Sequence, residues 1–344
     1  MTRIAIDADV LGRRRTGDET YIASLLRELA DAPEEIFAVT RRPDLVPPGI
    51  EPIELPARNQ IVRMTLSFPR LLRRLHPDLA HFLYAIPPGY RSRAVVTVHD
   101  LSFEHLPDVM SFKDRLLFRT QVPRSVRRAD RVLTGSEQTK RDLIERYGLA
   151  EERIAVTPYG VDALYSPEGP RHEGHYALFV GAIQPRKDPL AALEALALTN
   201  GNLRLILVGQ EKLGGDQVRE AIGRLGLEER VELAGHVERD ELAALYRGAA
   251  VLVYPSRYEG FGFPVLEAMA SGTPVVAARA GAIPEVAGDA AVLVEPGDPV
   301  ALAGGIERAL ADGDRLVAAG LERASRYSWA ETARQTLEVY RELT

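Results

Sequence analysis

Short apolar runs alternate with amphipathic helical patterns along most of the chain, and this alternation restricts its fold more than any other feature. In the first half, helical patterns at residues 20–29, 114–128 and 137–147 separate apolar runs that we predict to be buried strands, at residues 4–6, 36–39, 79–83, 94–98, 132–134 and 154–157. Strands that alternate with helices in this way form parallel sheets covered on both faces. The sequence therefore predicts a doubly wound α/β fold.

The alternation stops once and then restarts. Residues 158–176 are rich in Pro and Gly, lack apolar periodicity and are predicted to form a linker. Six further strands are predicted after it, at residues 177–180, 203–208, 231–233, 250–254, 273–277 and 291–294. A chain of 344 residues is too long for one ordinary core. We therefore expect two doubly wound, Rossmann-like domains that face a cleft. The predicted boundaries are residues 1–165 and 166–326, with a C-terminal helix of about residues 327–344 packed back on the first domain.

Composition excludes several classes of protein. The chain has no Cys, so it has neither disulfides nor thiolate ligands, and its net charge of −6 argues against a nucleic-acid-binding protein. The N-terminus has a strand pattern and not that of a signal peptide. No run approaches the roughly 20 apolar residues that span a bilayer. We expect a cytoplasmic protein.

One stretch in the second half combines a strand, a glycine-bearing loop and a helix start. It reads VLVYPSRYEGFGFPVLEAMASG over residues 251–272, and Pro264 and Gly272 are predicted to begin and end its short helix. Such a loop directs unpaired backbone N–H groups into one crevice, where they stabilise an anion. Glu259 and Glu267 would repel that anion, so we expect them to accept hydrogen bonds from hydroxyl groups. The stretch thus indicates a nucleotide-sugar site.

Arg186 and Lys187 lie just before the helix predicted to begin at Pro189. Two cations beside a helix N-terminus add to the positive partial charge already there, and a bound anion would remove this conflict. Arg presents a planar fork to a phosphate and Lys a point charge. Taken alone, the pair fits two solvated surface side chains equally well. Together with residues 251–272, it predicts a phosphate-binding site.

His99 and Asp100 directly follow the strand predicted at residues 94–98. They therefore stand at the carboxyl end of the first sheet, where doubly wound folds bind their ligands. An imidazole there could hydrogen-bond a sugar or move a proton. The alternative is a strand-end His that is satisfied by Asp100.

The loop after the first strand also contains glycines, Gly12 and Gly17, and leads into a helix predicted from about residue 20. This corner is predicted to accept an anion in the same way. Asp7 and Asp9, at the end of that strand, form too thin a ligand set for a metal ion.

Familiar signatures of other enzymes are missing. GFGFPV lacks the third glycine of a dinucleotide-binding G-x-G-x-x-G motif, and no P-loop occurs. The nucleophile elbow G-x-S-x-G is absent too. The chain is therefore not expected to be a hydride-transferring dehydrogenase, a P-loop NTPase or an α/β-hydrolase.

The motifs together resemble glycosyltransferase family 4, the retaining enzymes of GT-B architecture. The resemblance is carried by EGFGFPVLEAMASGTPVVAARAGAIPEVAGDAAVLVEPGD, FVGAIQPRKDP, GHVERDELAALYRGAAVLVYPS and ADRVLTGSEQTKRDL. It covers most of the chain, more loosely in the first half, and is strongest to bacterial mannosyltransferase-like members that contain a segment such as VTVHDLSFEHLP. In many members an Arg directly follows the strand-end glycine, whereas here Gly181 is followed by Ala182. Arg186 would then supply the second cation.

The resemblance implies roles for individual residues. Glu259 would face the donor hexose, Glu267 the ribose hydroxyls, and Arg186 and Lys187 the diphosphate, while the amides of Gly260, Phe261 and Gly262 would contact the sugar. Gly17 and Gly12 would let the first loop approach the diphosphate, and His99 would lie near the sugar. The implied catalytic set is thus His99, Glu259, Arg186 and Lys187. Neither a metal ion nor another cofactor would be required.

The implied reaction is the transfer of a hexosyl group, mannose-type or glucose-type, from a nucleotide diphosphate sugar such as a GDP- or UDP-hexose to a glycan or lipid-linked acceptor. Two alternatives remain open: a nucleotide-sugar 2-epimerase of the same architecture, and a non-catalytic nucleotide-sugar-binding protein. Residues 61–75 mix apolar side chains with arginines. They suit either contact with the inner face of an anionic membrane or an ordinary amphipathic helix packed on the sheet.

Overall fold

The computed structural model describes residues 2–13, 16–56, 59–106, 112–199 and 201–344. Their contacts divide the chain into two compact units. The first comprises Met1–Phe103, Met110–Gly160 and Ser328–Thr344, and the second comprises Glu104–Val109 and Val161–Tyr327. The main segment of the second unit thus begins inside the Pro- and Gly-rich stretch of residues 158–176. Each unit is described by itself.

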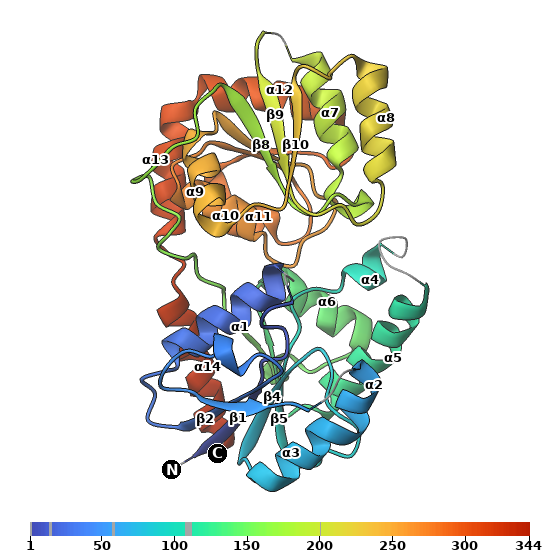
Figure 1. The fold of residues 1–344 in the computed structure, drawn as a ribbon, viewed down its shortest axis with the longest axis vertical. Coiled ribbons are helices and arrows are strands. Elements are labelled where there is room, and N and C mark those ends of the chain that lie inside the picture. The colour runs from blue at the N-terminus through green and yellow to red at the C-terminus, as the bar shows by residue number, and fades with distance from the viewer. Residues whose placement is uncertain (1, 14–15, 57–58, 107–111, 200) are drawn as a thin grey trace. The chain divides into compact units, whose positions relative to one another are not determined.

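The first unit is built on a seven-stranded parallel sheet with the order β3-β2-β1-β4-β5-β6-β7 (Figure 1). Its strands are β1 (Arg3–Asp7), β2 (Glu35–Thr40), β3 (Glu51–Glu54), β4 (Leu79–Leu83), β5 (Arg93–Thr97), β6 (Arg131–Thr134) and β7 (Ile154–Val156). Strand β3 was not predicted, because its sequence EPIE contains no apolar run. A strand with two Glu and a Pro suits only the edge of a sheet, which is where β3 lies.

Helices cover both faces of this sheet. One face is covered by α1 (Thr16–Glu28) and by α14 (Trp329–Leu343), which pack against each other. The other face carries α3 (Phe68–Leu75), α5 (Phe112–Arg128) and α6 (Glu137–Tyr147), whose apolar side chains share one core with those of the strands. The shorter elements are η1 (Pro43–Leu45), α2 (Gln60–Val62), η2 (Arg63–Ser67), α4 (Ser102–His105) and η4 (Glu151–Arg153).

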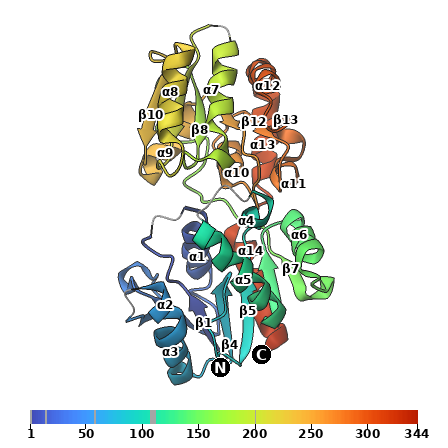
Figure 2. The same cartoon turned by 90° about the vertical axis from the view of Figure 1, so that its right-hand side faces the viewer.

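The second unit has a six-stranded parallel sheet with the order β10-β9-β8-β11-β12-β13 (Figure 2). The strands are β8 (Tyr176–Val180), β9 (Arg204–Val208), β10 (Val231–Gly235), β11 (Val251–Tyr254), β12 (Val275–Ala278) and β13 (Val292–Val294). On one face lie α7 (Pro189–Leu198), α8 (Gly215–Leu225) and α12 (Pro299–Ala311). The remaining elements are η5 (Pro185–Lys187), α9 (Arg239–Gly248), α10 (Phe263–Ala270), α11 (Ile283–Ala287), η6 (Gly288–Ala290) and α13 (Gly313–Ala324), of which α9 and α13 pack against α10.

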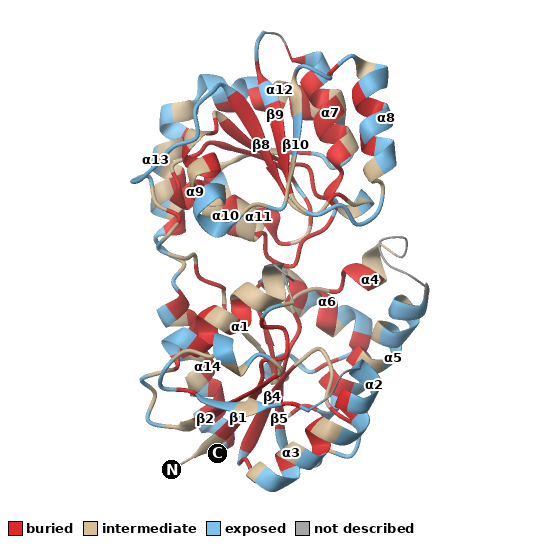
Figure 3. Ribbon diagram, in the orientation of Figure 1, coloured by how far each residue is buried: buried red, intermediate tan, exposed pale blue. Residues whose placement is uncertain are grey.

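In both sheets the strand order reverses once, between β1 and β4 and between β8 and β11. The inner strands of both sheets are mostly buried (Figure 3), whereas the edge strands β3 and β10 are partly exposed. The predicted fold class, two doubly wound Rossmann-like units, is confirmed. Ligands of such sheets bind outside the carboxyl ends of the strands at the point of reversal. In the second unit, this rule predicts a ligand site at the loops after β8 and β11. Within the described residues, no helix is both long and apolar enough to cross a bilayer.

Candidate functional site

The loops that follow β8 and β11 leave the sheet side by side, because these two strands are hydrogen-bonded neighbours with Val251 opposite Ala177. The first loop ends in η5, which carries Arg186 and Lys187. The next residue, Asp188, adopts a left-handed conformation with φ 53° and caps α7. Its carboxylate also pairs with Arg257 of the second loop, with 2.7 Å between Oδ2 and Nε. This ion pair therefore links the two loops.

A buried carboxylate joins the two predicted cations. Glu259 accepts from Lys187 Nζ at 2.6 Å through Oε1 and lies 3.0 Å from Arg186 Nη1 through Oε2. Lys187 Nζ also donates to the Tyr254 hydroxyl at 2.7 Å, and Ser256 Oγ donates to Glu259 Oε1. We call Arg186, Lys187 and Glu259 the ion triad. Two features predicted separately from the sequence are thus one structural unit.

The ion triad retains a net positive charge. Burial alone would raise the pKa of Glu259, but the charges of Arg186 and Lys187 outweigh it and lower that pKa to about 2. The carboxylate is therefore ionised at any physiological pH and pairs with both cations. The charges of these three side chains sum to +1, which suits an anionic ligand, and the low dielectric of a buried site strengthens that attraction.

A close backbone approach fixes Glu259 from the other side. The loop between β12 and α11 contains Gly281, at φ 55°, and a Cβ at this position would lie 2.2 Å from the Glu259 carbonyl oxygen. The same carbonyl accepts a hydrogen bond of 2.8 Å from the amide of Ala282. Only glycine permits this contact, and it sets where the Glu259 side chain begins.

The loop from Gly260 to Gly262 continues directly into α10. Gly262 has φ 108° and is the N-cap of α10, which begins at Phe263, just before the predicted proline start. The ring of Phe261 is buried and packs edge-on against Phe263 and Tyr327, with centroids 5.3 and 5.9 Å apart. Phe261 is therefore anchored by its side chain, and its backbone is held at the start of α10.

Glu267 lies on α10 and has a different environment from Glu259. Its Oε2 accepts a hydrogen bond of 2.9 Å from the hydroxyl of Tyr246. Burial raises the pKa of Glu267 to about 7, with only partial opposition from that hydrogen bond and from Arg239. The pKa values of the two predicted glutamates thus differ by about 5. Glu259 is ionised at neutral pH, whereas Glu267 titrates near pH 7.

A small hollow lies at the carboxyl ends of β9 and β10. It is lined mainly by apolar side chains and glycines, namely Ile183, Leu207, Gly209, Glu211, Gly215, Val218, Leu233 and Gly235. Leu233 is 37% exposed at its rim. This hollow was not predicted from the sequence, because apolar strand ends and glycines carry no chemical signature of their own.

In the first unit, His99 follows β5 as predicted and is held by aromatic residues. Its Nδ1 bonds the Tyr159 hydroxyl at 2.7 Å, and its ring meets those of Tyr21 and Tyr84 edge-on. Its Nε2 has no hydrogen-bond partner among the described residues. Burial lowers the pKa of His99, against the charges of Asp18 and Asp100, so the imidazole is largely neutral.

Asp100 does not satisfy His99 through a hydrogen bond. Its Oδ1 accepts from the Ser102 amide at 3.0 Å instead, at the start of α4. The alternative of a His paired with its sequence neighbour therefore does not describe this structure. Nothing in the sequence except their aromatic character indicates a role for Tyr84 or Tyr159. Tyr84 adopts a left-handed φ of 59° directly after β4.

The two glycines predicted to bind the donor from the loop after β1, Gly12 and Gly17, have different surroundings. Gly12 lies in a turn with φ 72°, and its amide donates to Glu19 Oε1 at 2.7 Å. Gly17 lies inside the first turn of α1, which begins at Thr16 and not near residue 20. Asp18 and Glu19 account for the earlier start, since acidic side chains in the first turn offset the helix dipole.

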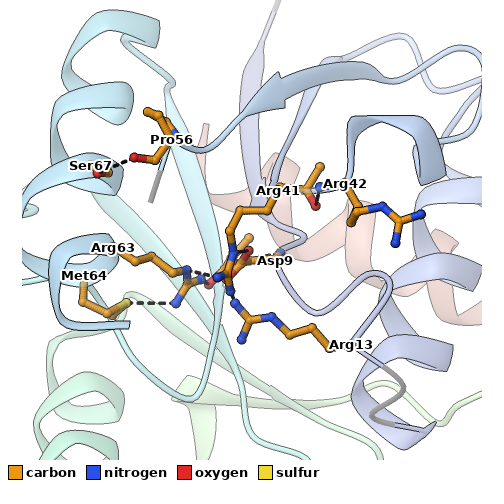
Figure 4. A network of polar contacts seen from close by, with 10 residues as sticks. Asp9, Arg13, Arg41, Arg42, Pro56, Arg63, Met64 and Ser67 are labelled. Carbon is orange, nitrogen blue, oxygen red and sulfur yellow. Dashed lines mark hydrogen bonds and ion pairs between the residues drawn. The ribbon is translucent and has the colours of Figure 1, made fainter. Parts of the chain in front are cut away.

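Asp7 and Asp9 end β1 inside a network of arginines. Asp9 pairs with Arg41 at 2.7 Å, with Arg63 at 2.9 Å and with Arg13, and Asp7 pairs with Arg63. Figure 4 shows these guanidinium groups converging on Asp9. Both carboxylates are thus engaged by arginines. No group of three or more His, Asp or Glu side chains in the described part of the chain is arranged to hold a metal ion.

Of the predicted site residues, the structure brings Arg186, Lys187 and Glu259 into direct contact and places Gly260, Phe261 and Gly262 on the loop that follows. Glu267 lies on the adjoining helix with its own partner. Gly12, Gly17 and His99 belong to the first unit, and their predicted roles stay predictions. Three hydroxyl groups that hold the glutamates or their partner Lys187 were not predicted from the sequence, those of Tyr254, Ser256 and Tyr246. Position at a strand end was the only available signal for the first two.

The chain has sequence relatives among known proteins. A family profile described as Glycosyl transferases group 1 matches residues 164–335, and one described as Glycosyltransferase Family 4 matches residues 15–163. The chain is 30% identical over 301 residues to the O-antigen chain mannosyltransferase B of Escherichia coli, a match that covers 78% of each protein. It is also 30% identical to a D-inositol 3-phosphate glycosyltransferase of Acidothermus cellulolyticus, over 95% of this chain and 85% of that protein.

Solved structures share the fold over the whole chain. The sucrose-phosphate synthase of Thermosynechococcus elongatus superposes with a TM-score of 0.82 at 24% identity and covers 100% of this chain and 99% of its own. Anabaena Alr3699/HepE, solved in complex with UDP and glucose, superposes with a TM-score of 0.78 at 20% identity and 99% coverage of both chains. These similarities identify the architecture as GT-B.

Proposed function

The chain belongs to the group 1, family 4 glycosyltransferases, and we propose that it transfers a hexosyl group from a nucleotide diphosphate sugar with retention of configuration. The hexose is mannose-type or glucose-type, and the acceptor is a glycan or a lipid-linked saccharide. The mannosyltransferase among the relatives supports a mannose-type sugar, and the UDP and glucose bound to a protein of the same fold support a nucleotide-sugar donor.

The observation that carries this proposal is the ion triad at the carboxyl ends of β8 and β11. Arg186 and Lys187 would bind the diphosphate, because a fork and a point charge together neutralise two phosphate groups. Glu259, held ionised by both cations, would accept hydrogen bonds from the hexose hydroxyls. The amides of Gly260, Phe261 and Gly262 would contact the same sugar.

Glu267 and the apolar hollow would bind the nucleoside part of the donor. A carboxylate at Glu267 would accept the two ribose hydroxyls. The hollow at the ends of β9 and β10 is apolar enough to receive one face of a planar base. Its lining offers few polar groups that distinguish one base from another, so we assign no base.

The proposed chemistry depends on stabilising the departing diphosphate. The bond between the anomeric carbon and the phosphate oxygen breaks, the acceptor oxygen bonds to the same face of the sugar, and its proton passes to the departing phosphate oxygen. Fixed positive charge aimed at that oxygen supplies the main electrostatic stabilisation. No metal ion is needed in this scheme. We expect full activity in excess EDTA, and activity lost to the chelator and restored by Mg²⁺ would contradict it.

The family favours transfer over the two alternatives. Both matching profiles and the relatives described above are glycosyltransferases. Slow release of nucleoside diphosphate without acceptor would support the enzyme, whereas a flat baseline would support a binding protein. Formation of an epimeric nucleotide sugar without acceptor would support the epimerase.

The donor is best identified by thermal shift with GDP, UDP and ADP and their hexose derivatives. Only a ligand that prefers the folded state raises the midpoint, by an amount that grows with its concentration over Kd. We expect one base to stand out, and its hexose derivative to serve as the donor in an acceptor assay. NMR of the product should then show the anomeric configuration of the donor. No response to any nucleotide, or an inverted product, would contradict the proposal.

A further inference from the structure

Residues 60–75 form one continuous helical run with a change of winding in the middle. The run passes from α2 through the π-helical turn η2 into α3, and Asn59 caps its start by accepting from the Val62 amide at 2.9 Å. In the π-turn the Phe68 amide donates five residues back, to the Arg63 carbonyl. Pro69 follows at once, and it cannot donate to a preceding carbonyl. The wide turn lets the helix continue past this proline.

The π-turn decides which side chains face water. It accommodates one residue more than an α-turn. The residues after it are therefore rotated by about 100° about the helix axis, relative to their positions in an uninterrupted α-helix. As a result Arg63 and Met64 are buried on the same side as Phe68 and Leu72. The exposed side chains fall on the opposite side and form a second stripe, which consists of Gln60, Ile61, Val62, Thr65, Leu66, Arg70, Arg73 and Arg74.

This stripe, here called the basic–apolar face, has an unusual composition for a solvent-exposed surface. Ile61 is 76% exposed and Leu66 is 42% exposed. Residues 59–75 include no Asp or Glu. Among the described residues no carboxylate pairs with Arg70, Arg73 or Arg74, whereas Arg63 is held inside by Asp7 and Asp9. The face therefore presents three uncompensated positive charges beside exposed apolar side chains.

We propose that the basic–apolar face binds the surface of a membrane that contains anionic lipid. A helix that lies in the interface inserts apolar side chains at the headgroup boundary and places Lys or Arg against anionic headgroups. The exposed stripe supplies both kinds of side chain, whereas the residues of the buried stripe pack inside the unit. A second copy of the chain would not match it as well, because two such faces would repel each other. The inference goes beyond the proposed transfer reaction and does not depend on it.

Flotation with vesicles tests this directly. The full-length protein is mixed with vesicles of neutral phosphatidylcholine alone or with 30 mol% phosphatidylglycerol, and its partition coefficient is measured at low and high salt. We expect binding only to the anionic vesicles, and we expect high salt to weaken it. Each arginine near an anionic surface contributes about fivefold to partitioning. The variant Arg70→Gln/Arg73→Gln/Arg74→Gln should then lose roughly a hundredfold.

Two further variants separate specific binding from a general charge effect. Arg146→Gln/Arg224→Gln/Arg308→Gln removes three exposed arginines from the last turns of α6, α8 and α12 and should float like the wild type. Ile61→Ser/Leu66→Ser keeps all charges and should weaken binding at either salt concentration. Failure of the wild type to float, or equal loss in the control triple variant, would overturn the proposal. So would a concentration-dependent dimer, detected by light scattering, that Ile61→Ser/Leu66→Ser dissociates.

Discussion

At the scale of single residues, the candidate site contains two buried glutamates whose side chains have different partners. Glu259 is held by two cations, and Glu267 by the hydroxyl of Tyr246. The sequence predicts that both glutamates bind a ligand, one from a loop and one from a helix, but it does not predict that their pKa values differ. That difference depends on Lys187, which is 72 residues from Glu259 in the chain and reaches it only through the pairing of β8 with β11.

Glu259→Gln tests whether this carboxylate orients the sugar or merely balances charge. The variant removes the one negative charge of the ion triad, so we expect nucleoside diphosphate to bind at least as tightly as to the wild type. Turnover of the nucleotide sugar should fall by about a hundredfold, as for loss of one preorganised group. Removal of a buried charge partner should also lower the free energy of unfolding by about 3 kcal/mol, measured in urea. Unchanged turnover would contradict the assignment.

Glu267 is predicted to make the fold pH-dependent. Its pKa rises from 4.5 in the unfolded chain to about 7 in the fold. The fold therefore favours the protonated form, and this contribution to stability is complete below pH 4.5 and is lost as the pH rises through 7. Glu267→Gln should be more stable than the wild type at pH 8, by on the order of 1–3 kcal/mol, and little different at pH 4.5.

The matched measurement is the unfolding free energy at pH 4.5 and pH 8 for the wild type, Glu267→Gln and Glu307→Gln, the last an exposed position on α12. The same Glu267 variant should bind nucleoside diphosphate more weakly at pH 8, since an amide accepts only one of the two ribose hydroxyls well. Equal pH dependence in all three proteins would show that Glu267 is not the titrating group.

At the scale of elements, apolar periodicity predicted most strands and helices close to their observed bounds. It failed where packing or capping decides the structure. The edge strand β3 has no apolar run, the acidic residues Asp18 and Glu19 extend α1 over Gly17, and the π-turn η2 has no sequence signature except the following Pro69. Register and strand order in the sheets lie beyond periodicity altogether, because they are set by contacts between distant segments.

Gly281→Ala tests how the loop between β12 and α11 positions Glu259. The new Cβ would lie 2.2 Å from the Glu259 carbonyl oxygen, so one of the two loops must move. We expect a loss of stability of several kcal/mol and at least a tenfold loss of turnover. Gly297→Ala is the control, since Gly297 has a similar φ of 75° but open space around its Cβ position. That variant should cost only about 1 kcal/mol and keep its turnover. Equal effects of both would mean that backbone strain alone accounts for the result.

At the scale of the whole molecule, the last helix belongs to the first unit although it follows the second in the chain. Tyr340 of α14 bonds the buried His81 at 2.5 Å, and Thr332 donates to the Pro158 carbonyl at 2.6 Å. Trp329 stacks on Tyr159, the residue that holds His99. The C-terminus therefore supports the aromatic surroundings of His99.

Removal of residues 328–344 should destabilise the first unit alone. By calorimetry we expect its transition to fall by more than 10 °C or to disappear, because deletion uncovers apolar and aromatic side chains that α14 buries. The transition of the second unit should stay in place. Tyr340→Phe is the mild control and should cost about 1 kcal/mol, as for one hydrogen bond. Equal shifts in both transitions would contradict the division into units.

The central claim is that Arg186 and Lys187 hold the departing diphosphate of a nucleotide sugar. The most direct test is the rate at which nucleoside diphosphate is released from the identified donor by the wild type, Lys187→Ala and Lys212→Ala. Lys212 is an exposed lysine of the same unit and serves as the matched control. We predict at least a hundredfold loss for Lys187→Ala with its circular dichroism spectrum unchanged, and a normal rate for Lys212→Ala. A near-normal rate for a folded Lys187→Ala protein would contradict the account.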